Sequence, residues 1–338
     1  MNYIYSGAHK PLLFATALKE SGENITIITD NEDVKKFCIS EKIDYIEFES
    51  VRHSVGNILK IIFYKKKLNH VLDRINIQKE DCFYLISSRI KCYPGFYMAK
   101  ELAKKGSVIY KDPHDQLLEK YIPKKNKPVF FRGLIIKSLL HYVYGLDLVC
   151  YELNNFLSLG IDDSFLKKHN IKIFEPNEYY HKLSFEGIKN SKRNCRDFDS
   201  LIIDSGSLEN RIVQESVDSV FEKILKLPVE YAFKKHPSKV QNHSDMAHYK
   251  IYEQCEEIPS YMPVELFYNN IKRNVVSINS ASLITASQLQ HLKVISLLEL
   301  VDWCRESFKK ETKQYLIEKS KNKILFPTSF EELKKIIL

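Results

Sequence analysis

A histidine flanked by lysines and a proline follows a short apolar stretch in the second half of the chain. The run reads Phe233-Lys234-Lys235-His236-Pro237-Ser238. Because proline fits neither a β-ladder nor a helix interior, a strand is expected to end here and to present His236 in a loop. Ammonium groups beside an imidazole suit an anionic leaving group, which needs positive charge and a proton. The alternative is a solvated basic corner with an incidental histidine.

Two more polar loops follow predicted strands, and they read Asp204-Ser205-Gly206-Ser207 and Ser277-Ile278-Asn279-Ser280-Ala281-Ser282. Serine hydroxyls and backbone N–H groups at a helix start form a cradle for phosphate, although Ser280 could equally be a plain N-cap. Glu265 lies in the first turn of a predicted helix, where it could accept ribose hydroxyls or simply favour the helix dipole.

A βαβ rhythm positions these loops. The predicted strands are Tyr3 to Ser6, Ile25 to Thr29, Tyr45 to Phe48, Cys82 to Ser87, Val108 to Tyr110, Leu201 to Asp204, Val229 to Phe233, Val275 to Ile278, Val294 to Leu297 and Ile324 to Phe326. The predicted helices between them include Leu12 to Glu20, Pro94 to Lys105, Glu209 to Lys226, Pro263 to Ile271 and Trp303 to Lys319. Alternation of this kind predicts an α/β protein with two Rossmann-like domains facing a cleft. We expect an N-terminal domain over 1–155, a linker or crossing segment over 156–199 and a C-terminal domain over 200–338.

Composition sets the broad class. The chain has 338 residues, of which 44% are hydrophobic, and a formal net charge of +8, so it can bury a sizeable core and favours anionic partners. Its seven cysteines include no C-x-x-C pair, which argues against a disulfide framework and a zinc site. Without an apolar run of about 18 residues or a leader-like start, we expect a cytoplasmic protein.

Basic residues near Lys124 to Lys137 are interleaved with apolar ones at nearly helical spacing. Such a stretch could contact an anionic inner membrane peripherally. The alternative is a helix that packs its Leu/Ile face on the core and leaves its lysines in water.

Together, the order of these segments resembles the donor half of bacterial lipooligosaccharide sialyltransferases and capsule polysialyltransferases, which have the GT-B fold. The resemblance rests on Leu201-Ile202-Ile203 with its Ser/Gly loop, Lys235-His236-Pro237, Pro259 to Glu265 and Ser277 to Leu283. It implies that His236 contacts the donor phosphate as general acid, that Ser280 and Ser282 bind the same phosphate, and that Glu265 holds the ribose. Donor-binding residues in the same loops are Ser205, Gly206, Lys235 and Pro237.

The family's catalytic base is a carboxylate after a strand of the N-terminal domain. The corresponding run is Lys111-Asp112-Pro113-His114-Asp115, where Lys111 and Pro113 depart from the family's acidic-acidic-glycine motif. Asp112 is the first candidate, with Asp115 or His114 in reserve, and an Asp-Pro turn with Asp115 as a helix cap is the structural alternative. Some members have been suggested to use the donor-half loop, which offers Asp204 and Glu209.

The resemblance therefore predicts inverting transfer of sialic acid or a related nonulosonic acid from a CMP-sugar to a lipooligosaccharide or capsule acceptor, with no metal or other cofactor required. The pattern Asp197-Phe198-Asp199 precedes a strand and receives no role. Alternatives are transfer from CMP-Kdo or a UDP-sugar, and a non-catalytic protein that binds anionic glycans or RNA. No nucleic-acid-binding module is recognisable, so no nucleic-acid partner is expected.

Overall fold

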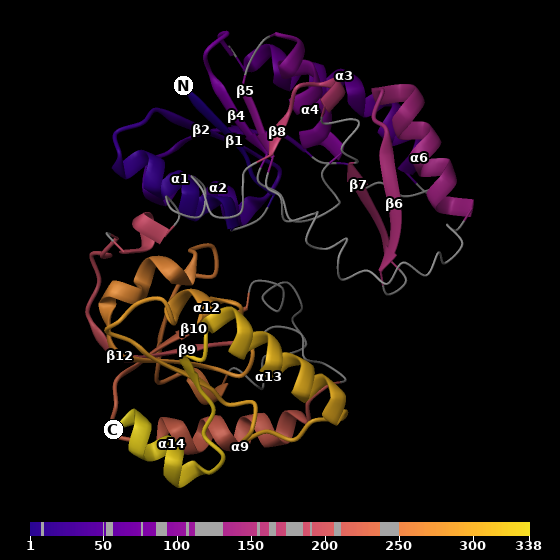
Figure 1. Cartoon of the computed structure of the whole chain (residues 1–338). Helices are drawn as coiled ribbons and strands as arrows, with labels where there is room; N and C mark the ends of the chain where they lie inside the picture. Colours follow the sequence, from indigo (N-terminus) through magenta and orange to yellow (C-terminus); the bar gives the residue numbers. More distant parts are fainter. Residues whose placement is uncertain are drawn as a thin grey trace. The chain divides into compact units, whose positions relative to one another are not determined.

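A computed structural model of the chain divides into two compact units, Met1–Gly187 and Ile188–Leu338, and each unit has its own parallel sheet (Figure 1). The structure describes residues 1–7, 10–49, 51, 57–75, 77–85, 93–105, 108–111, 131–153, 156–161, 167–173, 185–189, 191–205, 211–236 and 250–338.

The first unit contains a doubly wound sheet. Its described elements are β1 (Asn2–Tyr5), α1 (Lys10–Glu20), β2 (Ile25–Thr29), α2 (Glu32–Glu41), β3 (Asp44–Glu47), α3 (Ile58–Arg74), β4 (Cys82–Leu85), α4 (Tyr93–Lys104), β5 (Val108–Lys111), α6 (Phe131–Tyr144), β6 (Leu148–Leu153), β7 (Phe156–Ile161) and β8 (Lys172–Ile173). The sheet order is β3-β2-β1-β4-β5-β8, and every pairing is parallel. All residues of β1 and β2 are buried, as expected for strands that are covered on both faces.

Helix α4 packs closely on the centre of this sheet at a glycine. A Cβ atom at Gly95 would lie 2.7 Å from Leu85 Cδ1 of β4 and 2.9 Å from Tyr5 Cδ1 of β1. Behind the helix, the ring of Tyr144 from α6 makes edge contacts with Tyr93 and Tyr97, at centroid distances of 5.3 and 5.2 Å. The aromatic residues therefore join α4 and α6 into one core.

The second unit repeats the same winding. Its described elements are β9 (Phe198–Ile203), α9 (Gln214–Leu225), β10 (Tyr231–Lys234), η3 (Lys250–Tyr252), β11 (Glu256–Glu257), η4 (Val264–Asn270), β12 (Ile271–Ser277), α12 (Ser282–Ala286), β13 (Lys293–Ser296), α13 (Glu306–Ser320), β14 (Ile324–Leu325) and α14 (Phe330–Ile337). The parallel strands have the order β11-β10-β9-β12-β13-β14, in which the first strand along the chain lies in the middle. This is the strand order of a Rossmann sheet, so the predicted α/β fold class with two Rossmann-like domains is confirmed.

Segment 156–199, expected as a linker or crossing segment, contains strands of the first unit and the entry to the second. β7 pairs with β6 in an antiparallel hairpin, and β8 joins the first sheet beside β5. The sequence interpretation did not include this hairpin.

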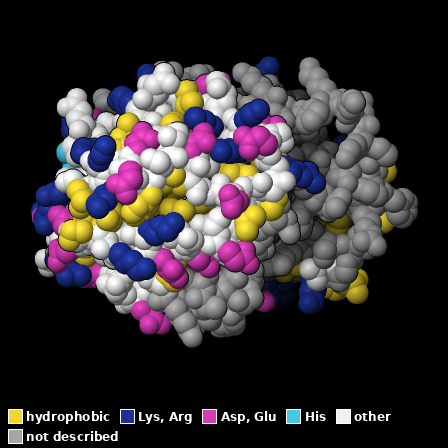
Figure 2. All heavy atoms as spheres, turned by 90° about the horizontal axis from the view of Figure 1, so that it is seen from below, with side chains coloured by type: hydrophobic (Ala, Val, Ile, Leu, Met, Phe, Trp, Pro, Cys, Tyr) yellow, Lys and Arg dark blue, Asp and Glu magenta, His cyan; other side chains and the backbone are white. Residues whose placement is uncertain are grey.

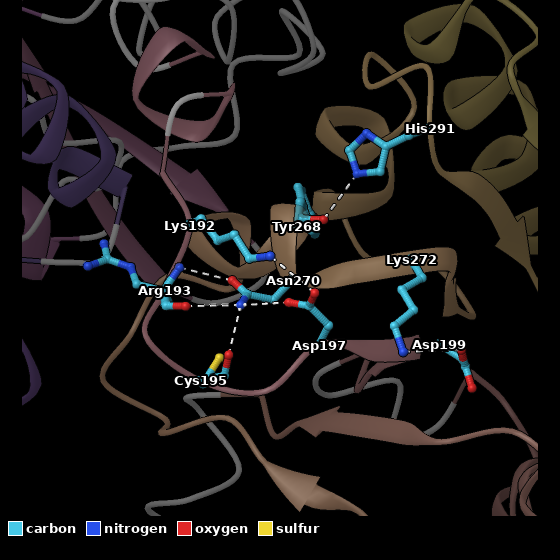
Figure 3. Close-up of polar contacts among 9 residues, drawn as sticks. All are labelled: Lys192, Arg193, Cys195, Asp197, Asp199, Tyr268, Asn270, Lys272 and His291. Carbon is cyan, nitrogen blue, oxygen red and sulfur yellow. Dashed lines mark hydrogen bonds and ion pairs between the residues drawn. The ribbon is translucent and has the colours of Figure 1, made fainter.

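Two asparagines of η4 hold the start of the second unit. Asn269 Nδ2 contacts the carbonyl oxygens of Ile188, Lys189 and Ser191 at 2.9, 2.9 and 2.6 Å. Asn270 accepts from the Arg193 backbone N–H at 2.9 Å and donates to its carbonyl oxygen at 3.0 Å (Figure 3). The polar segment before β9 is thereby fixed on η4.

Candidate functional site

Three of the predicted loops leave neighbouring strands at one edge of the second sheet. β10, β9 and β12 are consecutive in the strand order, and their carboxyl ends lie at the same edge because the strands are parallel. The chain moves from β9 to β10 on one side and later returns to β12 on the other. This reversal between β9 and β12 is the place where doubly wound sheets bind ligands.

His236 follows β10 and is half-buried. Its backbone N–H donates to Asp204 Oδ2 at 3.5 Å, while the Asp204 N–H donates to the carbonyl oxygen of Lys234 at 2.9 Å. Asp204 is only 8% exposed, so its carboxylate is held between the ends of β9 and β10. The structure therefore places the histidine loop, which follows β10 and begins at Lys235-His236, beside Asp204 and Ser205 at the end of β9.

The two lysines before His236 have separate partners. Lys234 is buried in β10, and its Nζ donates to the carbonyl oxygen of Pro259 at 2.7 Å. Lys235 Nζ forms an ion pair with Glu257 Oε2 at 2.6 Å, and its side chain is 27% exposed. Glu257 therefore balances part of the positive charge that the sequence interpretation assigned to a phosphate.

Ser205 links the ends of β9 and β12. Its Oγ accepts from the backbone N–H groups of Ile278 and Asn279 at 3.1 and 3.2 Å. Ser277 Oγ lies 3.0 Å from Ser205 Oγ and donates its proton to the Ile203 carbonyl oxygen at 2.7 Å. Because a serine hydroxyl has one proton, Ser205 must donate in the contact between the two hydroxyls.

The predicted donor residues Glu265 and Ser282 contact each other. Ser282 Oγ donates to Glu265 Oε1 at 2.7 Å, and Ser280 Oγ accepts from the Ser282 backbone N–H at 3.3 Å. Ser280 Oγ thus accepts from the first residue of α12, whereas Ala281, which directly precedes the helix, makes no side-chain capping hydrogen bond. Tyr268 Oη donates to the Ser282 carbonyl oxygen at 2.7 Å, and burial, followed by the charge of Glu265, raises the pKa of Tyr268 well above its ordinary value.

Asn279 is a polar group of this edge to which the sequence interpretation gave no role. Its side-chain Oδ1 is buried and has no hydrogen-bond partner in the described structure. A buried acceptor without a donor costs free energy unless a ligand supplies one. Its place in the run Ser277 to Ser282, directly after a strand, is the sequence signal that could have identified it.

Several predicted site residues lie outside the described part of the chain. These are Asp112, His114, Asp115, Gly206, Glu209 and Pro237. In the described part, no group of three or more His, Cys, Asp or Glu side chains is arranged to hold a metal ion.

The carboxylates of the Asp-Phe-Asp pattern lie at the opposite, amino end of β9. Asp197 forms an ion pair with Lys192 at 3.1 Å, and Asp199 lies 3.8 Å from Lys272 Nζ (Figure 3). The backbone N–H of Glu230 also donates to Asp199 at 3.3 Å. These contacts connect β9 with its neighbours and leave the pattern without a role at the ligand edge.

No protein-family model matches the sequence, and no curated protein is significantly similar to it. Among solved structures, the chain is similar to the glycotransferase of kitacinnamycin, with 11% identity, a TM-score of 0.48 and coverage of 99% of this chain and 89% of the other. Heptosyltransferase WaaC of E. coli with ADP-2-deoxy-2-fluoro heptose has 10% identity, a TM-score of 0.41 and coverage of 88% of each chain. UDP-N-acetylglucosamine 2-epimerase from Rickettsia bellii has 12% identity, a TM-score of 0.45 and coverage of 99% and 86%. Because proteins of different activity share likeness at this level, these comparisons assign no activity.

Proposed function

We propose that this chain is an inverting glycosyltransferase that moves sialic acid or a related nonulosonic acid from a CMP-sugar to a surface glycan. The acceptor in this proposal is a hydroxyl of a lipooligosaccharide or capsule polysaccharide, and the enzyme works at the cytoplasmic side of the membrane. The nucleotide occupies the second unit, at the edge formed by the loops after β10, β9 and β12.

One observation carries the proposal: Asp204 and Ser205 join the histidine loop to the serine loop, which is the run Ser277 to Ser282 at the end of β12. The junction lies where the strand order reverses. Asp204 accepts from the N–H of His236, and Ser205 accepts from the N–H of Ile278 and of Asn279. A leaving phosphate needs an acid on one side and hydrogen-bond donors on the other, fixed relative to each other before reaction. Adjacent residues of one short loop supply this fixed spacing.

In the proposed step, the acceptor oxygen attacks the anomeric carbon as the bond from that carbon to the phosphate oxygen breaks. CMP leaves with the bonding electron pair, and His236 donates a proton to the phosphate. The carboxylate base takes the proton of the acceptor hydroxyl, so charge and protons balance. A monophosphate leaving group has less charge than a diphosphate. In the proposal, His236, the amides of Ser280 and Ala281, and Lys235, which also pairs with Glu257, stabilise it without a metal ion.

Glu265 and Ser282 fit a role in holding the sugar part of the nucleotide. A carboxylate that already accepts from one hydroxyl, at 2.7 Å, has further lone pairs for ribose hydroxyls. Asn279 Oδ1 has no donor in the described structure and would accept from a ribose hydroxyl or the amino group of cytosine. We add Asn279 to the proposed donor-binding residues for this reason.

Asp112 remains our proposed base, with Asp115 in reserve. Asp204 is less suited to that role, because its buried carboxylate already accepts from the backbone of the histidine loop. A residue that fixes the loop serves as a positioning residue.

A nucleotide-binding measurement tests the proposal. The melting temperature of the full chain is measured with CMP, CDP, UMP and UDP, because a ligand that binds only the folded state raises it. We expect the largest rise with CMP, and the rise should shrink in Asn279→Ala but persist in Asn69→Ala, where the exposed asparagine lies on α3 of the first unit. A selective rise of the melting temperature with UDP would mean that the donor is a UDP-sugar and not a CMP-sugar. Binding of RNA, with no change of melting temperature in the presence of any of the four nucleotides, would overturn the enzyme proposal.

A further inference from the structure

Exposed apolar side chains are concentrated on two helices of the first unit. Of the eleven large hydrophobic residues that are exposed in the described part of the chain, five lie on α3 and α6. They include the three most exposed ones, Leu59 at 69%, Phe63 at 74% and Tyr142 at 84%, and the other two are Ile62 and Leu134. Isolated exposed hydrophobic residues are ordinary, but a cluster on neighbouring helices suggests a binding surface.

The two helices touch each other near these residues. Tyr144 Oη at the end of α6 donates to the Ile61 carbonyl oxygen in α3, and Lys65 Nζ donates to the Val143 carbonyl oxygen at 2.7 Å. Tyr142 precedes Val143, and Ile62 and Phe63 follow Ile61. The exposed apolar residues of α3 and the end of α6 therefore gather around one helix junction.

The inner faces of both helices are already used by the core. Ile61, Tyr64 and Leu68 of α3 are buried, and Ile136 and Leu140 of α6 are 1% and 0% exposed. Helix α6 thus packs an Ile/Leu face on the core, which was the alternative interpretation for the basic stretch near Lys124 to Lys137. On α6, the residues at Leu134, Lys137, Ser138, His141 and Tyr142 are exposed, and this spacing forms a second stripe on the opposite side.

The exposed residues among the apolar ones are mainly basic. Helix α3 has five lysine and arginine residues and one aspartate, and α6 has no acidic residue. Lys67 is paired with Glu49 at 2.9 Å, whereas Lys60, Lys66 and Lys137 are exposed. By contrast, basic and acidic side chains are interspersed over the described part of the face in Figure 2.

We propose that the α3–α6 face, defined by Leu59, Lys60, Ile62, Phe63, Lys66, Leu134, Lys137 and Tyr142, rests on the surface of a bilayer that contains anionic lipid. Bulky apolar side chains enter the headgroup region while lysines meet lipid phosphates, as in helices that lie in the membrane interface. A protein partner fits less well, because lysine is depleted from the centres of protein–protein interfaces. In the described residues, no helix is long and apolar enough to span a membrane.

Vesicle flotation of the full chain tests this proposal without requiring any enzymatic activity. Vesicles of phosphatidylcholine alone are compared with vesicles that contain about one third phosphatidylglycerol, at low and high salt. We expect flotation with the anionic vesicles, weaker flotation at high salt, and little with phosphatidylcholine. Equal or absent flotation with both vesicle types would overturn the proposal, even if the chain formed dimers.

Two double variants separate the apolar contribution from the charge. Leu59→Ser with Phe63→Ser, and Lys60→Glu with Lys66→Glu, should each lower the affinity for anionic vesicles by about tenfold or more, because insertion and charge attraction both contribute. Tyr315→Ser with Lys310→Glu is the matched control on α13 of the second unit, where Tyr315 is 45% exposed. Melting temperatures establish that each variant is folded. Wild-type flotation of both α3 variants would contradict the assigned surface.

Discussion

At the scale of single residues, Ser205 uses its whole hydrogen-bonding capacity inside the site. Its proton goes to Ser277 Oγ, since the Ser277 proton is used on the Ile203 carbonyl oxygen. Its oxygen accepts from two backbone N–H groups of the serine loop. We therefore interpret Ser205 as a positioning residue that sets the shape of the loop.

Ser205→Ala should reduce both stability and turnover. The two N–H groups would lose their acceptor, and a part-buried donor without a partner costs about 1–3 kcal/mol. The measurement combines urea unfolding with the kinetics of transfer, in which kcat should fall more than nucleotide affinity. Ser205→Thr, which keeps the hydroxyl, should recover part of the loss, and Ser138→Ala on the exposed side of α6 is the control. Unchanged unfolding in Ser205→Ala would contradict the assigned bonds.

His236→Ala should lower kcat by about 10²–10⁴, the usual contribution of a general acid. The fold should survive, because the side chain is half-buried and the backbone N–H that contacts Asp204 is retained. Turnover of a CMP-sugar and the melting temperature are measured together, with the exposed His70→Ala as control. A His236→Ala protein with normal turnover would remove this histidine from the mechanism.

At the scale of elements, η4 holds the segment that leads into β9. Asn270 is 1% exposed and uses both ends of its amide: it accepts from the Arg193 N–H and donates to the carbonyl oxygens of Arg193 and Cys195 (Figure 3). Its neighbour Asn269 is more exposed, so water can replace its bonds. The entry into the second unit therefore depends mainly on one buried amide.

Asn270→Ala should destabilise the second unit by about 2–3 kcal/mol, and Asn269→Ala by about 1 kcal/mol. The backbone groups that contact the buried Asn270 amide cannot form replacement hydrogen bonds with water, whereas those that contact Asn269 can. The single tryptophan of the chain, Trp303, lies in the second unit and reports its urea unfolding by fluorescence. Equal effects of the two variants would show that burial does not distinguish these amides.

Helix α13 is tied to the loop after β13 by one carboxylate. Glu299 contacts Lys309 at 2.6 Å and Lys313 at 2.7 Å. Although burial alone would raise the pKa of Glu299, the hydrogen bonds and charges of these lysines outweigh it and hold the pKa below its usual 4.5. A carboxyl group whose pKa is lower in the folded state stabilises the protein above its unfolded pKa and loses that effect as the pH falls through its folded pKa.

Glu299→Gln should therefore be less stable than the wild type at about pH 7, by about 1 kcal/mol, and the difference should shrink as the pH falls below 4.5 and through the lowered pKa of Glu299. Trp303 fluorescence during urea unfolding measures both proteins at each pH. The exposed Glu311→Gln on α13 should show no such trend. A difference that stays constant with pH would mean that the effect is not one of ionisation.

At the scale of the whole molecule, each unit has its own doubly wound sheet, and the proposed nucleotide residues described here all belong to the second unit. A fragment of residues 188–338 should consequently fold alone, with one cooperative urea transition, since units with a complete core commonly do so. Its melting temperature should rise with CMP. If the fragment folds but its melting temperature does not change with CMP, residues of the first unit are needed for nucleotide binding. If the fragment does not fold, the two cores are not independent.

The sequence by itself determined the strands and their order along the chain. Short β-rich runs such as Ile25 to Thr29, alternating with helical segments, predicted β2 and most of its counterparts, because strands buried on both faces are nearly continuously apolar. The β6–β7 hairpin was not predicted. Its two apolar runs flank Asn154-Asn155, and this pair lacks the glycine of the strongest hairpin-turn signals. The same pattern could not distinguish Ser280 as a helix cap from Ser280 as a phosphate ligand.

Only the tertiary structure decided which polar residues meet. Glu265 with Ser282, Lys235 with Glu257, and Ser205 with the amides after β12 are pairs separated by 17, 22 and more than 70 positions. No local propensity encodes such pairs, since they depend on the order of strands in the sheet and on the edge where the strands end. The residue types that could do chemistry can thus be identified from the sequence, whereas their partners depend on how distant segments fold onto one sheet.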